Sequence, residues 1–188
     1  GEYWAPGEVN LLQDYIDATE GCMSLFDSSL QQNFHIASKE GADYDLRKIF
    51  DETLTLMNPA FSVTVVDNHD TQPLQALEAP VEKWFKPLAY ALILLRKDGY
   101  PCVFYPDLFG ATYTDKDKEG NDQEIFLDKV EKIEELLKAR QLFAYGEQHD
   151  YFEDANCLGW IREGDGLNKG CAVVLSNKDA YEKSMEIG

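Results

Sequence analysis

Apolar side chains recur every three to four residues in five stretches of the chain, which is the period of a helix with one buried face. The first stretch stops at Gly21, a residue type that is favoured just past a helix end. Pro87 lies inside the fourth stretch, so that helix should either kink there or start a second time. The predicted helices span residues 8–20, 28–38, 44–57, 80–98 and about 122–141.

Short apolar runs separate these helices and predict strands at 22–26, 61–67 and 101–105. The middle run is rich in β-branched residues and apolar on both faces, which is typical of a strand covered on both sides in a parallel sheet. Helices and strands therefore alternate as parallel βα units, and the first part of the chain belongs to the α/β class.

The pattern changes after Gly146, where short β-like runs replace the helices. Turns that contain Gly, Asp and Asn separate these runs. We therefore expect an α/β unit at 1–146 and the start of a truncated β-sandwich domain at 147–188. The β-like runs lie at 157–162, 170–175 and 181–187.

Charge and cysteine usage narrow the possible partners. The 188 residues include 17 basic and 35 acidic side chains, and the net charge of −18 would repel nucleic acids and anionic membrane surfaces. The four cysteines form no C-x-x-C pair, which favours free thiols and a cytoplasmic protein, with secretion as the alternative. The longest apolar run, at 88–95, is too short to span a bilayer.

Candidate chemistry lies where strands end, because reactive groups in parallel βα folds gather there. Strand periodicity places Glu2 and Trp4 on one side of the first residues and Tyr3 on the other. A second acidic segment, 66–72, directly follows the buried strand. Two acids and an indole suit glycoside hydrolysis, which needs a proton donor, a flat apolar surface for a sugar ring and negative charge near an oxocarbenium ion.

Longer stretches of sequence carry a specific resemblance. Residues 1–4 (Gly-Glu-Tyr-Trp) and 66–70 (Val-Asp-Asn-His-Asp) resemble two short regions that define family 13 glycosidases. Residues 71–78 and 84–91 resemble bacterial liquefying-type α-amylases, especially the cytoplasmic ones. The resemblance implies about the second half of a (β/α)8 TIM barrel followed by the beginning of an all-β domain. It also implies a retaining, endo-acting enzyme that cleaves α-1,4-glucosidic bonds of starch, glycogen or maltodextrin.

The resemblance assigns a role to each matching residue. Glu2 would be the general acid/base, and its pKa would have to be raised for it to hold a proton. Asp70 would stabilise the transition state, and His69 would donate a hydrogen bond to a hydroxyl of the same sugar ring. Trp4 would line the adjacent sugar position. The substrate-binding residues implied in this way are His69, Trp4, Asn68 and Gln72.

The resemblance also indicates what these 188 residues lack. The family's nucleophilic aspartate lies on the preceding strand and has no counterpart here, so we expect no release of reducing sugar from starch by the chain alone. A half barrel with unpaired edge strands should also aggregate. We expect the full-length enzyme to be a monomer that binds an α-glucan.

Calcium is the cofactor that the resemblance implies, with its main ligands outside these residues. Residues 148–152 resemble a segment that would bind a further calcium through the His149 carbonyl and the Asp150 carboxylate. Asn177 stands where secreted relatives have an aspartate, which removes one anionic ligand. A second acidic cluster lacks EF-hand spacing and is interpreted as a solvated loop. It consists of Asp115, Asp117, Glu119 and Asp122.

Two other functions fit parts of the sequence. A His-Asp metal phosphohydrolase would need several histidines at metal-ligand spacing, and the three histidines here are not so spaced. A non-catalytic sugar-binding or interaction protein on the same barrel is the stronger alternative, because fold resemblance does not guarantee chemistry. An upstream strand ending in Arg-x-Asp would favour the enzyme.

Overall fold

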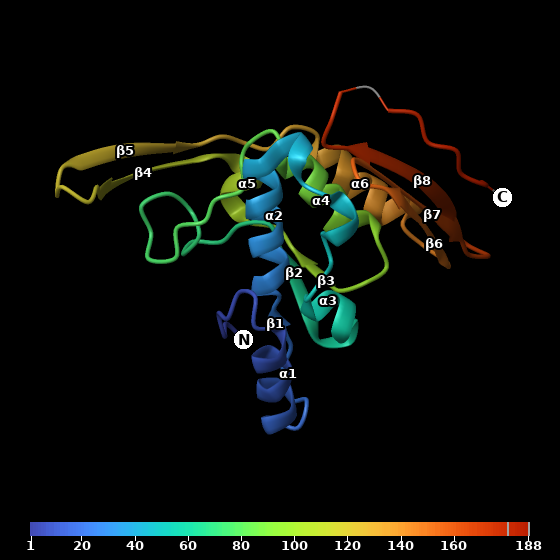
Figure 1. Cartoon of the computed structure of the whole chain (residues 1–188), viewed down its shortest axis with the longest axis horizontal. Coiled ribbons are helices and arrows are strands. Elements are labelled where there is room, and N and C mark those ends of the chain that lie inside the picture. Colours follow the sequence, from blue (N-terminus) through green and yellow to red (C-terminus); the bar gives the residue numbers. More distant parts are fainter. Residues whose placement is uncertain (180, 188) are drawn as a thin grey trace.

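A parallel sheet forms the centre of the computed structural model, which describes residues 1–179 and 181–187 (Figure 1). The middle strand pairs in parallel with both of its neighbours. This arrangement confirms the parallel sheet predicted from the β-branched run, although all three strands are shorter than expected. The strands, in spatial order, are β1 (Leu25–Phe26), β2 (Ser62–Val65) and β3 (Tyr100–Cys102).

The first two predicted helices are confirmed as α1 (Val9–Ala18) and α2 (Ser28–Glu40). The first buries one face through Val9, Leu12 and Ile16, as its periodicity indicates. Asp27 caps the second, because its Oδ1 accepts a hydrogen bond from the Leu30 amide at 3.0 Å.

The single helix predicted over 44–57 is wrong. Glu52 has a positive φ of 52°, a left-handed conformation that stops a right-handed helix. Thr53 then starts a new turn, accepting a hydrogen bond from the Leu56 amide at 3.2 Å. The region contains the 3₁₀ turn η2 (Leu46–Lys48) and the short helix α3 (Leu54–Met57), and it is flanked by the 3₁₀ turns η1 (Gly41–Asp43) and η3 (Pro59–Phe61).

The helix predicted over 80–98 is present but shorter in the structure, where α4 spans Lys86–Leu95. Pro87 occupies its first turn, where a missing backbone N–H costs nothing, so the proline marks a start and not a kink. Every residue from Ala89 to Leu95 is buried. Such all-round burial means that other layers cover α4 on every side.

The helix predicted over 122–141 is also wrong in its first part. The strands β4 (Ala111–Lys116) and β5 (Asp122–Leu127) form an antiparallel hairpin, and α6 spans only Ile133–Phe143. Phe126, expected on the helix's buried face, is 67% exposed. The acidic loop is the hairpin turn, in which Asp117 accepts a hydrogen bond from the Asn121 amide at 2.8 Å. Figure 1 shows the hairpin projecting from the body.

The last part of the chain is an antiparallel sheet in the order β6-β7-β8, as the predicted all-β character requires. The runs at 157–162 and 170–175 are confirmed as strands, whereas β6 was missed and residues 181–187 form no strand. Leu158, Trp160 and Leu175 share one core with α4 and α6. The strands are β6 (Gln148–Asp154), β7 (Cys157–Gly164) and β8 (Lys169–Ser176), and the remaining helix is α5 (Tyr105–Phe109).

Candidate active site at the carboxyl edge of the parallel sheet

The first residue of the chain extends the parallel sheet beyond β1. The Gly1 amino group donates to the Ser24 carbonyl at 2.5 Å, and the Phe26 amide donates to the Gly1 carbonyl at 3.2 Å. These two bonds on either side of Leu25 form the pattern of a parallel ladder. Gly1 therefore runs parallel to β1, and the residues after it leave the sheet at its carboxyl edge.

This pairing places Glu2 at the same edge as the segment that follows β2. Gly1 lies two strand spacings from β2, or roughly 10 Å at about 4.8 Å per spacing. Glu2 is exposed and Trp4 is half-buried. The chain thus brings the two predicted acidic segments, which are more than 60 residues apart in sequence, to one edge.

A tight turn after β2 holds the predicted residues 68–72. The Asn68 side-chain oxygen accepts hydrogen bonds from the Asp70 amide at 3.0 Å and the Thr71 amide at 2.9 Å. Asn68 is only 8% exposed, so its side chain supports the turn from beneath. The structure therefore gives Asn68 a role in shaping the backbone that carries His69 and Asp70.

The two side chains above this turn remain open to solvent. His69 Nε2 lies 3.6 Å from Asp70 Oδ1, and their side chains are 66% and 41% exposed. Gln72 is half-buried and lines a neighbouring cavity of about 360 Å³. Histidine and aspartate at this edge are free to face a ligand, as a sugar-binding role requires.

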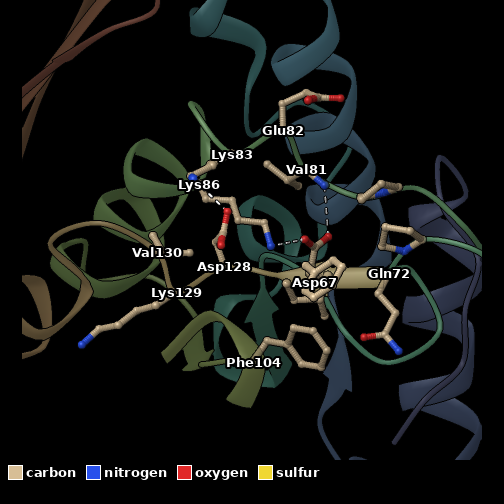
Figure 2. A pocket seen from close by; sticks show the side chains of 14 residues that line it. Asp67, Gln72, Val81, Glu82, Lys83, Lys86, Phe104, Asp128, Lys129 and Val130 are labelled. Atoms are coloured by element: carbon tan, nitrogen blue, oxygen red, sulfur yellow. Dashed lines mark hydrogen bonds and ion pairs between the residues drawn. The ribbon is translucent and has the colours of Figure 1, made fainter. Parts of the chain in front are cut away.

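Beneath the turn lies a buried group of charges that sequence reasoning missed (Figure 2). Asp67, the last residue of the apolar run, is 2% exposed and lies 2.7 Å from the Lys86 ammonium. Lys86 also contacts Asp107 at 2.5 Å, and Tyr90 donates to Asp107 at 2.6 Å. A charged residue directly after a buried strand, with a lysine in the first turn of an apolar helix, was the available signal.

Burial and charge shift the pKa values of this group. Burial raises the pKa of Asp67 to about 6, although the Lys86 ammonium opposes that rise. Burial alone would lower the pKa of Lys86, but the two carboxylates outweigh it and the pKa is raised. Burial and Asp107 also raise the pKa of Tyr90, which keeps its hydroxyl protonated and able to donate.

The two predicted calcium-binding residues lie elsewhere, on β6. Both oxygens of Asp150 bind the Arg96 guanidinium, at 2.7 and 2.8 Å, and the His149 ring pairs with Glu163 at 2.6 Å. Within residues 1–179 and 181–187, no three His, Cys, Asp or Glu side chains are grouped to hold a metal. Because an arginine takes both carboxylate oxygens, Asp150 does not fit a calcium ion in this arrangement.

Asn177, the third residue of that prediction, links the last strand to η1. Its amide nitrogen donates to the carbonyls of Gly41 and Tyr44, each at 2.8 Å. Its oxygen accepts a hydrogen bond from Asn156 at 2.9 Å. Asn177 therefore uses its amide as a donor, a role that an ionised aspartate could not fill.

These features define an α/β protein with a carboxylate-rich site at the carboxyl edge of a parallel sheet. Comparison with known proteins identifies its relatives. The chain is 54% identical over 187 residues to the cytoplasmic alpha-amylase of Escherichia coli (strain K12), and the match covers 100% of this chain and 38% of that protein. It is 44% identical over 189 residues to an alpha-amylase of Bacillus licheniformis, covering 100% and 35%.

A third relative extends the same result. The chain is 41% identical over 189 residues to a glucan 1,4-alpha-maltohexaosidase of Bacillus sp. (strain 707), covering all of this chain and 34% of that protein. The chain is therefore homologous along its whole length to bacterial α-amylases, which confirms the resemblance seen in the sequence. It spans only about a third of the length of these relatives.

No protein-family model matches the chain. None of the helices in the described residues has the length and apolarity that crossing a bilayer requires.

Proposed function

We propose that this chain forms part of a retaining, endo-acting α-amylase that hydrolyses α-1,4-glucosidic bonds of starch, glycogen or maltodextrin. The observation that carries the proposal is the parallel pairing of Gly1 with β1, which puts Glu2 at the edge where Asp70 lies. Homology to amylases along the whole chain supports it. A sugar-binding protein without catalysis would use Asp70 to accept hydrogen bonds from hydroxyls, but it would need no proton donor at Glu2.

In this proposal each residue of the candidate site has its own role. Glu2 protonates the glycosidic oxygen and later activates water. Asp70 counters the positive charge that develops on the sugar ring, and His69 donates to a hydroxyl of that ring. Trp4 offers an apolar surface to the neighbouring sugar, and Gln72 contacts substrate from the side of the cavity.

The remaining expectations belong to the full-length protein. The parallel sheet would be about the second half of a (β/α)8 barrel, and 147–188 would begin a separate β domain. We place the protein in the cytoplasm, because one relative is a cytoplasmic enzyme and the four cysteines are free. The expectation of a monomer rests on the resemblance alone. Calcium remains a prediction for segments outside these residues, and the chain alone is expected to be inactive.

The test uses the full-length protein with Glu2→Gln or Asp70→Asn, and soluble starch as substrate. Each change removes a charge without changing side-chain size, so kcat should fall by about 10²–10⁴-fold while folding is unaffected. Asp14→Asn, on the exposed face of α1, is the matched control and should keep full activity. Near-normal kcat in either site variant would overturn the proposal and favour a binding role.

A further inference from the structure

Lys86 is almost enclosed between two carboxylates that come from different elements. Its side chain is 13% exposed, and its ammonium lies 2.7 Å from Asp67 and 2.5 Å from Asp107. The two carboxylates are 2% and 1% exposed. Without the ammonium, two like charges would be buried side by side, which costs several kcal/mol or forces one of them to take a proton.

Asp67 connects both ends of the loop that carries His69 and Asp70. Its Oδ1 accepts a hydrogen bond from the Val81 amide at 3.2 Å, where the loop returns to the body. The same oxygen lies 3.4 Å from the Thr71 hydroxyl, which itself accepts a hydrogen bond from the Asn68 amide at 2.9 Å. The loop therefore begins and ends on one carboxylate.

Further backbone hydrogen bonds join the two sides of the loop that Asp67 holds at both ends. The Leu77 amide donates to the Asp70 carbonyl at 3.1 Å, and the Ala79 amide donates to the Thr71 carbonyl at 2.9 Å. A change in the position of Asp67 would therefore move the backbone on which Asp70 stands. Figure 2 shows Lys86 and the Val81 amide pointing at Asp67 from two sides.

We propose that Lys86 is a positioning residue for the loop of the candidate active site. Its ammonium keeps Asp67 in place as an ionised acceptor, and Asp67 in turn orients Asp70. Lys86 lines the cavity beside the site, where its ammonium is held by Asp67 and Asp107. This inference rests on the proposed amylase function, because it concerns the geometry of the same site.

Other charged groups face this cluster from the neighbouring elements. Asp107 approaches from α5, and Tyr90 of α4 donates to Asp107 while accepting a hydrogen bond from the Phe104 amide at 3.3 Å. Lys83 and Asp128 pair with each other at 2.9 Å on the rim of the cavity, and both are more than two-thirds exposed. The remaining charged residues of the rim are Glu82 and Lys129.

The experiment compares Lys86→Met with Lys83→Met in the full-length protein, measuring kcat and KM on soluble starch from pH 5 to 9. Loss of the buried ammonium should lower kcat by about 10- to 100-fold, since a small displacement of a reacting group costs that much, with little change in KM. The acidic limb of the pH profile should also move to higher pH, because Asp67 loses its cation. Lys83→Met removes an equal charge at the surface and should match the wild type.

Two milder variants guard against a failure to fold. Lys86→Arg keeps the charge and should restore the pH profile and part of kcat. Tyr90→Phe removes one hydrogen bond to Asp107 and should lower kcat by several-fold at unchanged secondary structure. An unshifted pH profile in Lys86→Met, or equal kcat losses in Lys86→Met and Lys83→Met, would overturn the positioning role.

Asp70→Asn in the same assay separates the two proposals. If Asp70→Asn is inactive while Lys86→Met and Tyr90→Phe are fully active, only the positioning role fails. If Asp70→Asn keeps its activity, the proposed function fails first.

Discussion

At the scale of single residues, Asp67 shows how burial and pairing compete. Burial raises its pKa from 3.8 to about 6, despite the ammonium 2.7 Å away. The folded protein therefore binds this proton more tightly than the unfolded chain does. The resulting contribution to stability is complete below about pH 4 and is lost as the pH rises through about 6.

This titration predicts how Asp67→Asn changes the pH dependence of stability. The free energy of unfolding of the wild type, relative to the variant, should fall by about 2–3 kcal/mol between pH 4 and pH 7, because a shift of two pKa units corresponds to that energy. Urea denaturation at several pH values measures the difference. Asp43→Asn, at an exposed position, should show no such trend. A wild-type advantage that grows with pH would contradict the prediction.

The sequence could name the exposed site residues but not the buried ones beneath them. Glu2, His69 and Asp70 stand in short motifs, and the structure places both motifs at one sheet edge. Lys86 lies in the stretch 84–91, which carried the resemblance but gave this lysine no role, and Asp107 lies in no stretch that was singled out. Their roles depend on contact between α4 and α5, which only the folded chain creates.

At the scale of elements, Asp27 ties three elements together at the end of β1. One carboxylate oxygen accepts a hydrogen bond from the Leu30 amide at 3.0 Å, which caps α2. The other accepts from both the amide and the hydroxyl of Thr55 in α3, each at 2.7 Å. The residue is fully buried, so water cannot replace it.

Asp27→Ala should therefore destabilise the protein by about 3 kcal/mol or more, since the two buried amides and the Thr55 and Ser62 hydroxyls lose their acceptor. Asp45→Ala is the matched control, because Asp45 also accepts from a nearby amide, that of Arg47 at 3.1 Å, but at a bond exposed to solvent. That change should cost about 1 kcal/mol or less. Midpoints of urea denaturation compare the two variants. Equal losses of stability would contradict the prediction that the buried carboxylate contributes more than the exposed one.

Helices and strands were predicted correctly where the spacing of apolar residues fitted only one of the two. The predictions failed where the spacing did not distinguish a helix from another conformation. The period of α1 and the two-sided apolar run of β2 each had one solution. Residues 122–127 (Asp-Gln-Glu-Ile-Phe-Leu) show no alternation of polar and apolar side chains, so their strand could not be predicted locally, and pairing with β4 decided for the hairpin. In 44–57 the left-handed Glu52 and the Thr53 cap overrode helical spacing.

At the scale of the whole molecule, Arg96 joins the α/β part to the antiparallel sheet. Its guanidinium binds both oxygens of Asp150 on β6 and lies 4.8 Å and 5.0 Å from the ring centroids of Phe50 and Phe152. Trp160 adds a bond of its own, from its indole to the Leu95 carbonyl at 3.3 Å. The same arginine is thus a charge partner and a stacking surface.

Arg96→Met should destabilise the protein by about 2–4 kcal/mol, because the buried fork and the stacked planes are lost together. Lys97→Met is the control at the adjacent position, where the ammonium and its partner Glu147 are both about half exposed or more. It should change stability by about 0.5 kcal/mol or less. Urea denaturation, monitored by tryptophan fluorescence, would measure the change in stability. Similar losses of stability in both variants would contradict the role of Arg96 in holding the two parts of the structure together.

The sequence by itself determined the local periods, the parallel α/β class and the homology, because these depend on the order and type of residues along the chain. Tertiary structure alone decided that Gly1 adds to the sheet beside β1, that 122–127 pair as a strand, and that Lys86 lies between two carboxylates. The physical reason is that burial, pairing and desolvation depend on partners distant in sequence. A local pattern can indicate that a residue has a partner, but packing selects which one.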